Sequence, residues 1–325
     1  MPELPEVETI RLGLRGKIVG LKIKDIQVFN PKSFIGSPKN LRGQKILKIW
    51  RRAKILGMEL GMSIADPAGS QPHPTSSLVT TSLRAVDGAP RSPSPALTLL
   101  FHLKMSGQLV FVQRQESRVQ SPANRFIGGH PTEDMMGELP NKSTRVIFEF
   151  SDGSKLYFND QRKFGWIRLI SKFEIRNSKF FSQLGPEPLE KDFTWQVLKN
   201  NLLKHKSMPV KVAIMDQSAV SGVGNIYANE ACFDAKIDPR MKVGSMDDNQ
   251  FKRLHKGIIK CLKDGIKYGG SSKVHFVNPE GKKGYFLDYA YVYWKEGERC
   301  KICGAEIKKM KLGGRGTYYC PKCQK

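Results

Sequence analysis

The first hydrophobic pattern along the chain has the period of a helix. Val7, Ile10 and Leu14 recur at spacings of three and four residues, which places them on one helical face. Pro5 suits a first turn, and Gly16 suits the point at which a helix stops. We therefore predict a short helix from Pro5 to about residue 15.

The pattern then changes to the alternation expected of β-strands. Short apolar runs lie between residues 18 and 60, from 97 to 112 and from 145 to 170, and Gly, Pro and Asn interrupt them. Runs of this kind are typical of antiparallel sheets. We therefore predict a domain of antiparallel sheets over residues 1–171.

Two stretches inside this domain lack the alternation. Residues 63–96 and 115–140 look irregular, and the first contains six prolines and no aromatic residue between Ser63 and Pro95. Such a composition buries too little apolar surface to offset the entropy lost on ordering. We predict irregular insertions at both places.

Helical periodicity dominates the second half of the chain. Residues 172–192 are expected to form a linker, and residues 193–270 a helical domain. Its clearest helix covers Met246–Tyr268, where apolar residues recur along one face. A glycine-broken loop region is predicted at 271–290. The overall fold class is therefore α+β.

Two of these helices carry capping signals. Asp192 is the expected cap of a helix that ends near Leu203. Ser245 and Asp248 form a start for the long helix that resembles a capping box.

The last four cysteines have the spacing of a structural zinc site. Cys300 and Cys303 form one C-x2-C pair, and Cys320 and Cys323 form a second pair after sixteen intervening residues. Four thiolates complete a closed tetrahedron, so the predicted metal is one structural Zn²⁺. Disulfides are the alternative. Residues 291–325 are therefore predicted to form a zinc finger.

The segment between the cysteine pairs predicts a β-hairpin. Residues 307–319 form two short strands around the turn 312–317, whose glycines suit positive φ. This turn leaves Arg315 exposed at the tip. The local sequence alone leaves open whether Arg315 is functional or belongs to a generic surface turn.

The charge of the chain favours a polyanion as its partner. Its 325 residues include 54 Lys and Arg against 30 Asp and Glu, a formal net charge of +24. Each cation that neutralises a phosphate releases a counterion, so nucleic acid is the expected partner and an anionic membrane surface the weaker rival.

No apolar run reaches the ~20 residues of a membrane span. Six cysteines, a start without a secretion signal and the zinc spacing favour a cytoplasmic protein.

The chain starts with residues that can carry covalent chemistry. If Met1 is removed, Pro2 supplies a secondary amine that titrates near ~8 and is partly unprotonated at neutral pH. Its attack on an aldehyde-like carbon gives a charged iminium, which is an electron sink for elimination. Glu3 could act beside it as an acid or a base. The alternative is that this segment only precedes a helix.

Other stretches suit contact with nucleic acid. Backbone amides at 222–224 could bind an anion where a helix begins, and Asn225 could add a hydrogen bond. Residues 159–166 set cations beside aromatic rings, which suits phosphate contact and wedging between bases. Met105 stands in a turn, where a core methionine is less expected. For each of them, tight packing or a solvated face is the alternative.

Together these stretches resemble the formamidopyrimidine-DNA glycosylases, the bacterial base-excision enzymes for oxidised purines. The matching motifs follow the family order over nearly the whole chain, apart from the two insertions. They lie at residues 2–8, 52–54, 104–107, 160–165, 184–189, 215–217 and 222–228 and in the zinc hairpin with Arg315.

The resemblance implies a β-sandwich, a helix–two-turn–helix domain and a zinc hairpin around a DNA cleft, with a lesion-recognition loop at 271–290. It implies that Pro2 attacks C1′ of the damaged nucleotide and that Glu3 donates a proton. Lys54 then assists β-elimination, and Arg315 assists δ-elimination. The implied partner is damaged double-stranded DNA, and the implied acting form is a monomer.

The resemblance also implies which side chains contact the DNA. The target atom is inaccessible in a stacked duplex, so the nucleotide must be extruded. The residues that match fillers of the gap left behind are Met105, Arg162 and Phe164. The residues that match phosphate contacts are Lys206, Lys211 and Asn225.

The chain departs from the family pattern at two places. Ser143 stands where the family usually has a histidine that contacts DNA. In the loop that grips the flipped purine, Lys273-Val274-His275 replaces the usual apolar, basic and acidic residues.

Two alternative functions follow from the same features. The related endonuclease VIII enzymes prefer oxidised pyrimidines, but they usually have glycine where this chain has Leu4, which favours purines. A zinc-stabilised nucleic-acid-binding protein without catalysis is the alternative from another class.

Overall fold

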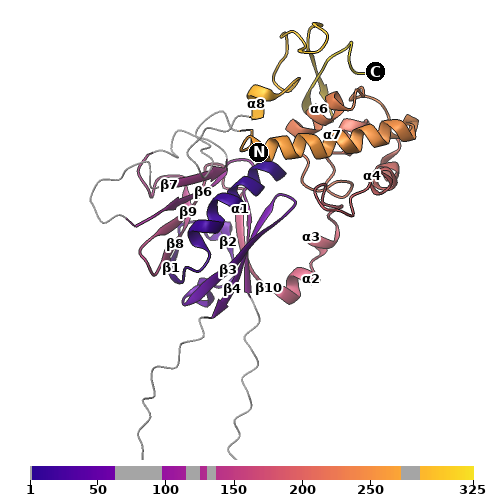
Figure 1. Cartoon of the computed structure of the whole chain (residues 1–325). Coiled ribbons are helices and arrows are strands. Elements are labelled where there is room, and N and C mark those ends of the chain that lie inside the picture. The colour runs from indigo at the N-terminus through magenta and orange to yellow at the C-terminus, as the bar shows by residue number, and fades with distance from the viewer. Residues whose placement is uncertain (1, 63–96, 115–124, 130–136, 272–285) are drawn as a thin grey trace, which may run out of the picture.

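The computed structural model describes residues 2–62, 97–114, 125–129, 137–271 and 286–325. Within these ranges, two five-stranded sheets occupy the first half of the chain, and helices and a two-stranded hairpin occupy the second (Figure 1). The predicted α+β class is confirmed. Among the described residues, no helix is both long and apolar enough to cross a lipid bilayer.

The elements of the described residues follow the predicted order of strands and then helices. The first half contains α1 (Leu4–Ile18), β1 (Ile23–Val28), β2 (Phe34–Ile35), β3 (Gln44–Arg52), β4 (Ile55–Met62), β5 (Leu97–His102), β6 (Gly107–Val112), β7 (Arg125–Gly129), β8 (Thr144–Phe150), β9 (Lys155–Asp160) and β10 (Trp166–Ser171). The second half contains α2 (Lys172–Arg176), α3 (Lys179–Ser182), α4 (Trp195–Leu202), α5 (Val210–Ala213), α6 (Asn225–Asp234), α7 (Asp248–Lys267), α8 (Phe286–Tyr289), β11 (Lys308–Leu312) and β12 (Arg315–Tyr319).

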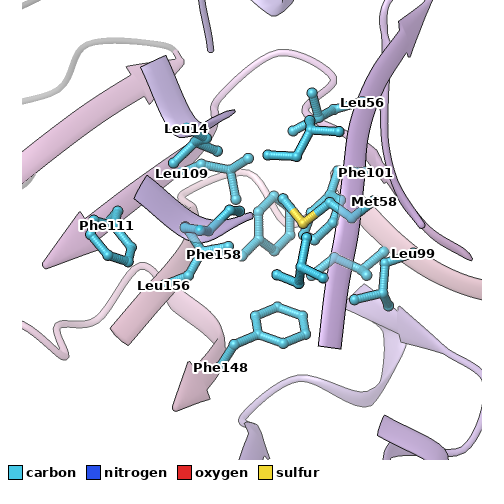
Figure 2. Close-up of a cluster of buried hydrophobic side chains, with 14 of the residues drawn as sticks. Leu14, Leu56, Met58, Leu99, Phe101, Leu109, Phe111, Phe148, Leu156 and Phe158 are labelled. Atoms are coloured by element: carbon cyan, nitrogen blue, oxygen red, sulfur yellow. The ribbon is translucent and has the colours of Figure 1, made fainter. Parts of the chain in front are cut away.

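The two sheets form the predicted sandwich. The strand order is β1-β8-β9-β6-β7 in one sheet and β2-β10-β5-β4-β3 in the other. All neighbouring strands are antiparallel except the short pair β2 and β10. Apolar side chains of both sheets form one buried cluster (Figure 2), in which the rings of Phe101 and Phe148 lie 5.9 Å apart. Full burial of each such ring contributes about 2 kcal/mol, so this cluster holds the sheets together.

Helix α1 belongs to two hydrophobic cores. Its side chains Val7, Ile10 and Leu14 lie in the sandwich cluster, whereas Leu4 lies in the cluster of the helical region. Each of these side chains is at most 1% exposed. The start of α1 also lies beside α7 (Figure 1). The beginning of the chain is therefore held where the two cores meet.

The structure corrects two predictions in the first half. Helix α1 passes the expected stop at Gly16 and ends at Ile18, because Ile18 is fully buried against the sandwich. The stretch 115–140 is not wholly irregular, since β7 within it pairs with β6 and buries Phe126. The other predicted insertion, 63–96, lies outside the described residues.

The caps of two later helices also differ from the prediction. Helix α4 begins after Thr194, whose hydroxyl accepts a backbone hydrogen bond 3.3 Å long, and not after Asp192. Helix α7 is capped by Asp247 with Gln250, and not by Ser245. Several residues in each stretch have side chains able to cap, so sequence locates the helix but not its first residue.

Two glycines of α1 give a matched test of its packing. A Cβ on Gly13 would lie 2.0 Å from Cε2 of Phe126, whereas a Cβ on Gly16 would meet nothing within 4 Å. We expect Gly13→Ala to lower the free energy of unfolding by about 1–3 kcal/mol, because the ring must move. Gly16→Ala should raise it by roughly 0.5–1 kcal/mol, since alanine is the better helix former. Urea unfolding measures both, and equal effects would contradict this packing.

Candidate active site and metal centre

The start of the chain is docked against the turn that precedes α6. Pro2 and Glu3 are both buried. The backbone N–H of Leu4 donates to Gly222 O at 3.0 Å. The carboxylate of Glu3 accepts a hydrogen bond from Ile226 N, in the first turn of α6, at 2.9 Å. These contacts join residues more than two hundred positions apart in the sequence.

The two glycines of this turn make the close approach possible. A Cβ on Gly224 would lie 2.3 Å from Cδ of Glu3, and a Cβ on Gly222 would lie 2.6 Å from Cδ1 of Leu4. Gly222 also has a φ of +85°, which favours glycine. A side chain at either position would displace the start of the chain.

The anion at the N-terminus of α6 is the protein's own carboxylate. The backbone N–H of Ile226 donates to the Glu3 carboxylate. The backbone N–H of Gly222 donates to the side chain of Gln217 at 2.9 Å. The predicted use of the Gly222 amide for phosphate is therefore wrong. The helix N-terminus instead stabilises the negative charge of Glu3.

The protonation of Glu3 is shifted by its surroundings. Burial raises the pKa of Glu3 from 4.5 to about 7, while the nearby charge of Lys54 opposes that rise and the charge of Glu6 adds to it. Its second oxygen, Oε2, is buried without a hydrogen-bond partner among the described residues. Glu3 can therefore gain or lose a proton near neutral pH.

Lys54 enters the site from the sandwich side. It lies in the turn between β3 and β4, next to Ala53, which has a φ of +52°. Its Nζ donates to Val223 O at 2.9 Å, and burial lowers its pKa. Glu187 holds the turn from the other side, since its carboxylate accepts from the amide of Ala53 and, at 2.7 Å, from Arg51.

Arg315 enters the site from the zinc hairpin. Gly313 and Gly314 have φ values of +56° and +73°, and they form the turn that pairs Leu312 with Arg315. The side chain of Arg315 is exposed at this end of the hairpin, as predicted. Asn225 Nδ2 donates to the carbonyl of Gly316 at 3.2 Å, which ties the hairpin to the start of α6.

A buried lysine completes the group of charges. Lys211 is fully buried, and its Nζ donates to Asn225 Oδ1 at 2.5 Å. Burial, together with the charge of Arg315, lowers the pKa of Lys211 to about 8, although the charge of Glu3 opposes this shift. The structure therefore brings Glu3, Lys211, Asn225 and Arg315 together. Lys206, in contrast, is exposed in the loop after α4.

The three predicted gap-filling residues lie on two neighbouring turns of the sandwich. Met105 is in the turn before β6, and Arg162 and Phe164 are in the turn before β10. The Ser106 hydroxyl, beside Met105, accepts from Arg162 N at 3.1 Å. Phe164 is 58% exposed, and the guanidinium of Arg162 lies 5.2 Å from its ring centre. An exposed aromatic ring with a cation over it is suited to insertion between bases.

Two further residues at the site were missed by sequence reasoning. His102 accepts from Lys104 N through Nδ1 at 3.0 Å, and burial, with the charges of Lys104 and Lys54, lowers its pKa to about 3. The neutral ring therefore carries its proton on Nε2. Tyr293, whose pKa is raised by burial, lies within reach of Asn225. His102 ends a hydrophobic strand and Tyr293 lies in a loop, so neither had a local signal.

The four cysteines predicted to bind zinc converge. Their sulfurs all lie within 4.8 Å of one another, with 3.4 Å between Cys303 and Cys320 and 3.9 Å between Cys300 and Cys323. Disulfides require about 2.05 Å, whereas sulfurs ~2.3 Å from a tetrahedral zinc lie roughly 3.8 Å apart. The arrangement fits one structural Zn²⁺, which would order the hairpin that carries Arg315.

The two departures from the family pattern have different outcomes. Ser143 is buried, and its carbonyl accepts from Asp160 N at 2.8 Å. The segment Lys273-Val274-His275 lies outside the described residues.

A β-sandwich and a helical domain that meet over a buried chain start, with a four-cysteine hairpin beside them, define the helix–two-turn–helix class of DNA glycosylases. The N-terminal domain model of formamidopyrimidine-DNA glycosylase matches residues 1–167, and the H2TH domain model of the same enzyme matches 184–276. A model described as a zinc finger found in FPG and IleRS matches 297–325. The chain belongs to the formamidopyrimidine-DNA glycosylase family.

Similar proteins span the whole chain. The formamidopyrimidine-DNA glycosylases of Listeria innocua and Pelotomaculum thermopropionicum are 33% and 34% identical to it, over all of this chain and at least 99% of theirs. A Lactococcus lactis FPG variant in complex with Fapy-dG-containing DNA has a TM-score of 0.76 at 30% identity, with complete coverage of both chains. MutM in complex with carbocyclic 8-oxo-G-containing DNA has a TM-score of 0.75 at 31% identity, also with complete coverage.

Removal of the metal tests the role of the cysteine cluster. We expect Cys320→Ser to bind less than one zinc ion per chain. Strand cleavage of damaged duplex DNA should fall at least ~10-fold, because the hairpin loses the metal that orders it. Cys232→Ala is the control, since Cys232 is buried in the helical core away from the cluster. Elemental analysis gives the stoichiometry, and full zinc occupancy in Cys320→Ser would contradict the assignment.

The raised pKa of Glu3 predicts how stability varies with pH. The carboxyl is protonated in both states below 4.5, but between 4.5 and about 7 only the folded protein keeps the proton. Stability contributed by this proton is lost as the pH rises, at about 1.4 kcal/mol per pKa unit. Glu3→Gln cannot ionise, so its stability relative to the unaltered chain should increase from pH 5 to pH 8. Urea unfolding at both pH values decides this, and a difference independent of pH would refute it.

Proposed function

We propose that Pro2, Glu3, Lys54 and Arg315 are the catalytic residues with which this family member excises oxidised purines and then cleaves the strand. Membership of the family makes the protein a DNA glycosylase and abasic-site lyase of base-excision repair. The observation that carries the residue assignment is the buried Glu3 carboxyl beside Pro2, with a free oxygen and a raised pKa.

The chemistry starts at the amine of Pro2 once Met1 has been removed. The amine bonds to C1′ of the damaged nucleotide while the C1′–N bond to the base breaks, and the departing base takes up the proton that the amine loses. A proton delivered by Glu3 accompanies the opening of the sugar ring, and an iminium forms between Pro2 and C1′. The iminium withdraws electrons from C2′, so loss of a C2′ proton expels the 3′ phosphate. Strand cleavage therefore follows base loss.

The two cations have separate tasks in this scheme. The lowered pKa of Lys54 leaves a larger neutral fraction, which suits it to proton transfer during β-elimination. The guanidinium of Arg315 stands at the exposed end of the hairpin, so it suits contact with the phosphate that leaves in δ-elimination. Both assignments follow the matched family motifs.

DNA contact uses two further groups of residues. Met105, Arg162 and Phe164, termed the wedge residues from here on, fill the space left by the extruded nucleotide. Phosphate contacts come from Lys206, Lys211, Asn225 and, in addition, His102, whose neutral ring offers an Nε2–H donor. The net charge of +24 supplies the non-specific part of the affinity.

The proposed enzyme works as a monomer in a reducing, cytoplasmic compartment. Glu3, Lys54, Lys211 and Arg315 all come from one chain, so the site needs no second copy. A site of four thiolates suits a compartment in which cysteines stay reduced.

Reductive trapping tests the covalent step. Borohydride should link the chain to duplex DNA containing 8-oxoguanine, because it reduces the iminium to a stable amine. Pro2→Gly should lower the yield at least ~10-fold, since a flexible primary amine replaces the fixed secondary one. A preparation that retains Met1, verified by mass spectrometry, is the control and should give no adduct. Failure of the correctly processed chain to form an adduct would overturn the proposal.

A further inference from the structure

Asp160, the last residue of β9, has a fully buried carboxylate. One oxygen accepts from the hydroxyl of Ser106 and, at 3.2 Å, from the backbone N–H of Arg162. The other accepts from Gly165 N at 2.6 Å. All three donors belong to the turns that carry the wedge residues.

The donors flank the wedge residues closely. Ser106 follows Met105 directly, and the amides of Arg162 and Gly165 lie on either side of Phe164. The two turns are far apart in the sequence, and the carboxylate of Asp160 bonds to both. It therefore fixes the distance between Met105 and Phe164 before any DNA is present.

The turns need such a constraint because their backbones are strained. Lys104 has a φ of +51° and Lys163 a φ of +58°, both in the left-handed region that disfavours residues with a side chain. At Gly165, a Cβ would lie 2.8 Å from Phe158 and 3.0 Å from the carboxylate of Asp160. Each turn is thus held in an unfavourable conformation by its bonds to the same side chain.

The carboxylate is held without a cation. Among the described residues no Lys, Arg or His forms an ion pair with it, and the nearby Arg145 donates to the backbone carbonyl of Asp160, at 2.8 Å. A buried charge that only amide and hydroxyl dipoles neutralise is costly unless every lone-pair direction is used. A side chain needed only for packing would be cheaper to bury as an uncharged group.

We propose that Asp160 is a positioning residue that presets the wedge for extrusion of the damaged nucleotide. The proposal rests on the assignment of Met105, Arg162 and Phe164 as wedge residues. Without Asp160, both turns would have to be ordered while they enter the duplex, and that loss of entropy would add to the cost of unstacking. The effect of losing Asp160 should be confined to steps in which a stacked base leaves the DNA duplex.

Two substrates distinguish a role of Asp160 in base extrusion from a general contribution to activity. A duplex with 8-oxoguanine requires extrusion of a stacked base, whereas the same duplex with a preformed abasic site does not. Asp160→Asn keeps the shape but places an N–H₂ group against donors that need an acceptor. We expect single-turnover excision of 8-oxoguanine to fall ~10- to 100-fold, on the scale of lost bonds to a charged group. Cleavage at the abasic site should change less than ~3-fold.

Asp152 offers a matched control. It lies in the turn between β8 and β9 and, like Asp160, accepts from a serine hydroxyl, at 2.6 Å, and from an amide, at 3.0 Å. Asp152→Asn should leave both rates unchanged. Ser106→Ala removes one bond to Asp160 while keeping the carboxylate, so it should shift the ratio of the two rates in the same direction. It also carries the test if Asp160→Asn fails to fold.

The outcomes are distinct. Equal loss on both substrates in Asp160→Asn, or no loss on either, would overturn the positioning role. If Asp160→Asn cannot be used, an unchanged ratio in Ser106→Ala would overturn it. A correctly processed, unaltered chain that forms no trapped adduct and cleaves neither substrate would instead overturn the proposed function on which this role rests.

Discussion

The hydrogen bond between the Glu3 carboxylate and the first turn of α6 is the contact on which the site depends. It requires glycine at 224, because any side chain there would overlap Glu3. It also sets the chemistry of Glu3, since the same docking that makes the bond removes the carboxyl from water and raises its pKa. The docking of Glu3 against α6 therefore determines both the position and the protonation of its carboxyl group.

The rest of the molecule supports that contact from three sides. Helix α1 is packed into both hydrophobic cores, so the start of the chain cannot shift relative to either domain. Glu187 fixes the turn that contains Lys54, and Asn225 connects the zinc hairpin to α6. Lys54 and Arg315 thus approach Glu3 from separate elements whose positions are set by buried polar bonds. Such bonds are specific in direction, whereas apolar packing alone is not.

Sequence reasoning was most successful where the pattern is local. Most strands of the sandwich, the long helix α7 and the C-x2-C pairs have a short-range signal and were predicted, whereas β7 was not. Prediction was least successful where tertiary contacts determine whether a helix or strand forms and where it ends. Ile18 extends α1 because the sandwich buries it, and β7 exists because β6 offers it a partner.

The same division applies to the site. The family motifs identified Pro2, Glu3 and Arg315 as candidate site residues, although nothing in their local sequence shows that they lie close together in the fold. His102 and Tyr293 were missed because each becomes part of the site only through residues distant in the chain. The use of the Gly222 amide was predicted wrongly, because its actual acceptor is the side chain of Gln217. Spacing along the chain shows which amides open a helix, but not which side chain, near or distant in the sequence, accepts from each of them.

The burial of Pro2 has a consequence for how the protein is made. Its amine becomes free only when Met1 is cut away, and a processing enzyme needs an extended terminus to reach that bond. Residue 3 leaves the ribosome long before residue 226, whose amide completes its setting. We therefore expect Met1 to be removed from the growing polypeptide, before the domains assemble. A copy that folds before this trimming would keep the Pro2 nitrogen, the proposed nucleophile, in its peptide bond to Met1, where a processing enzyme could no longer reach it.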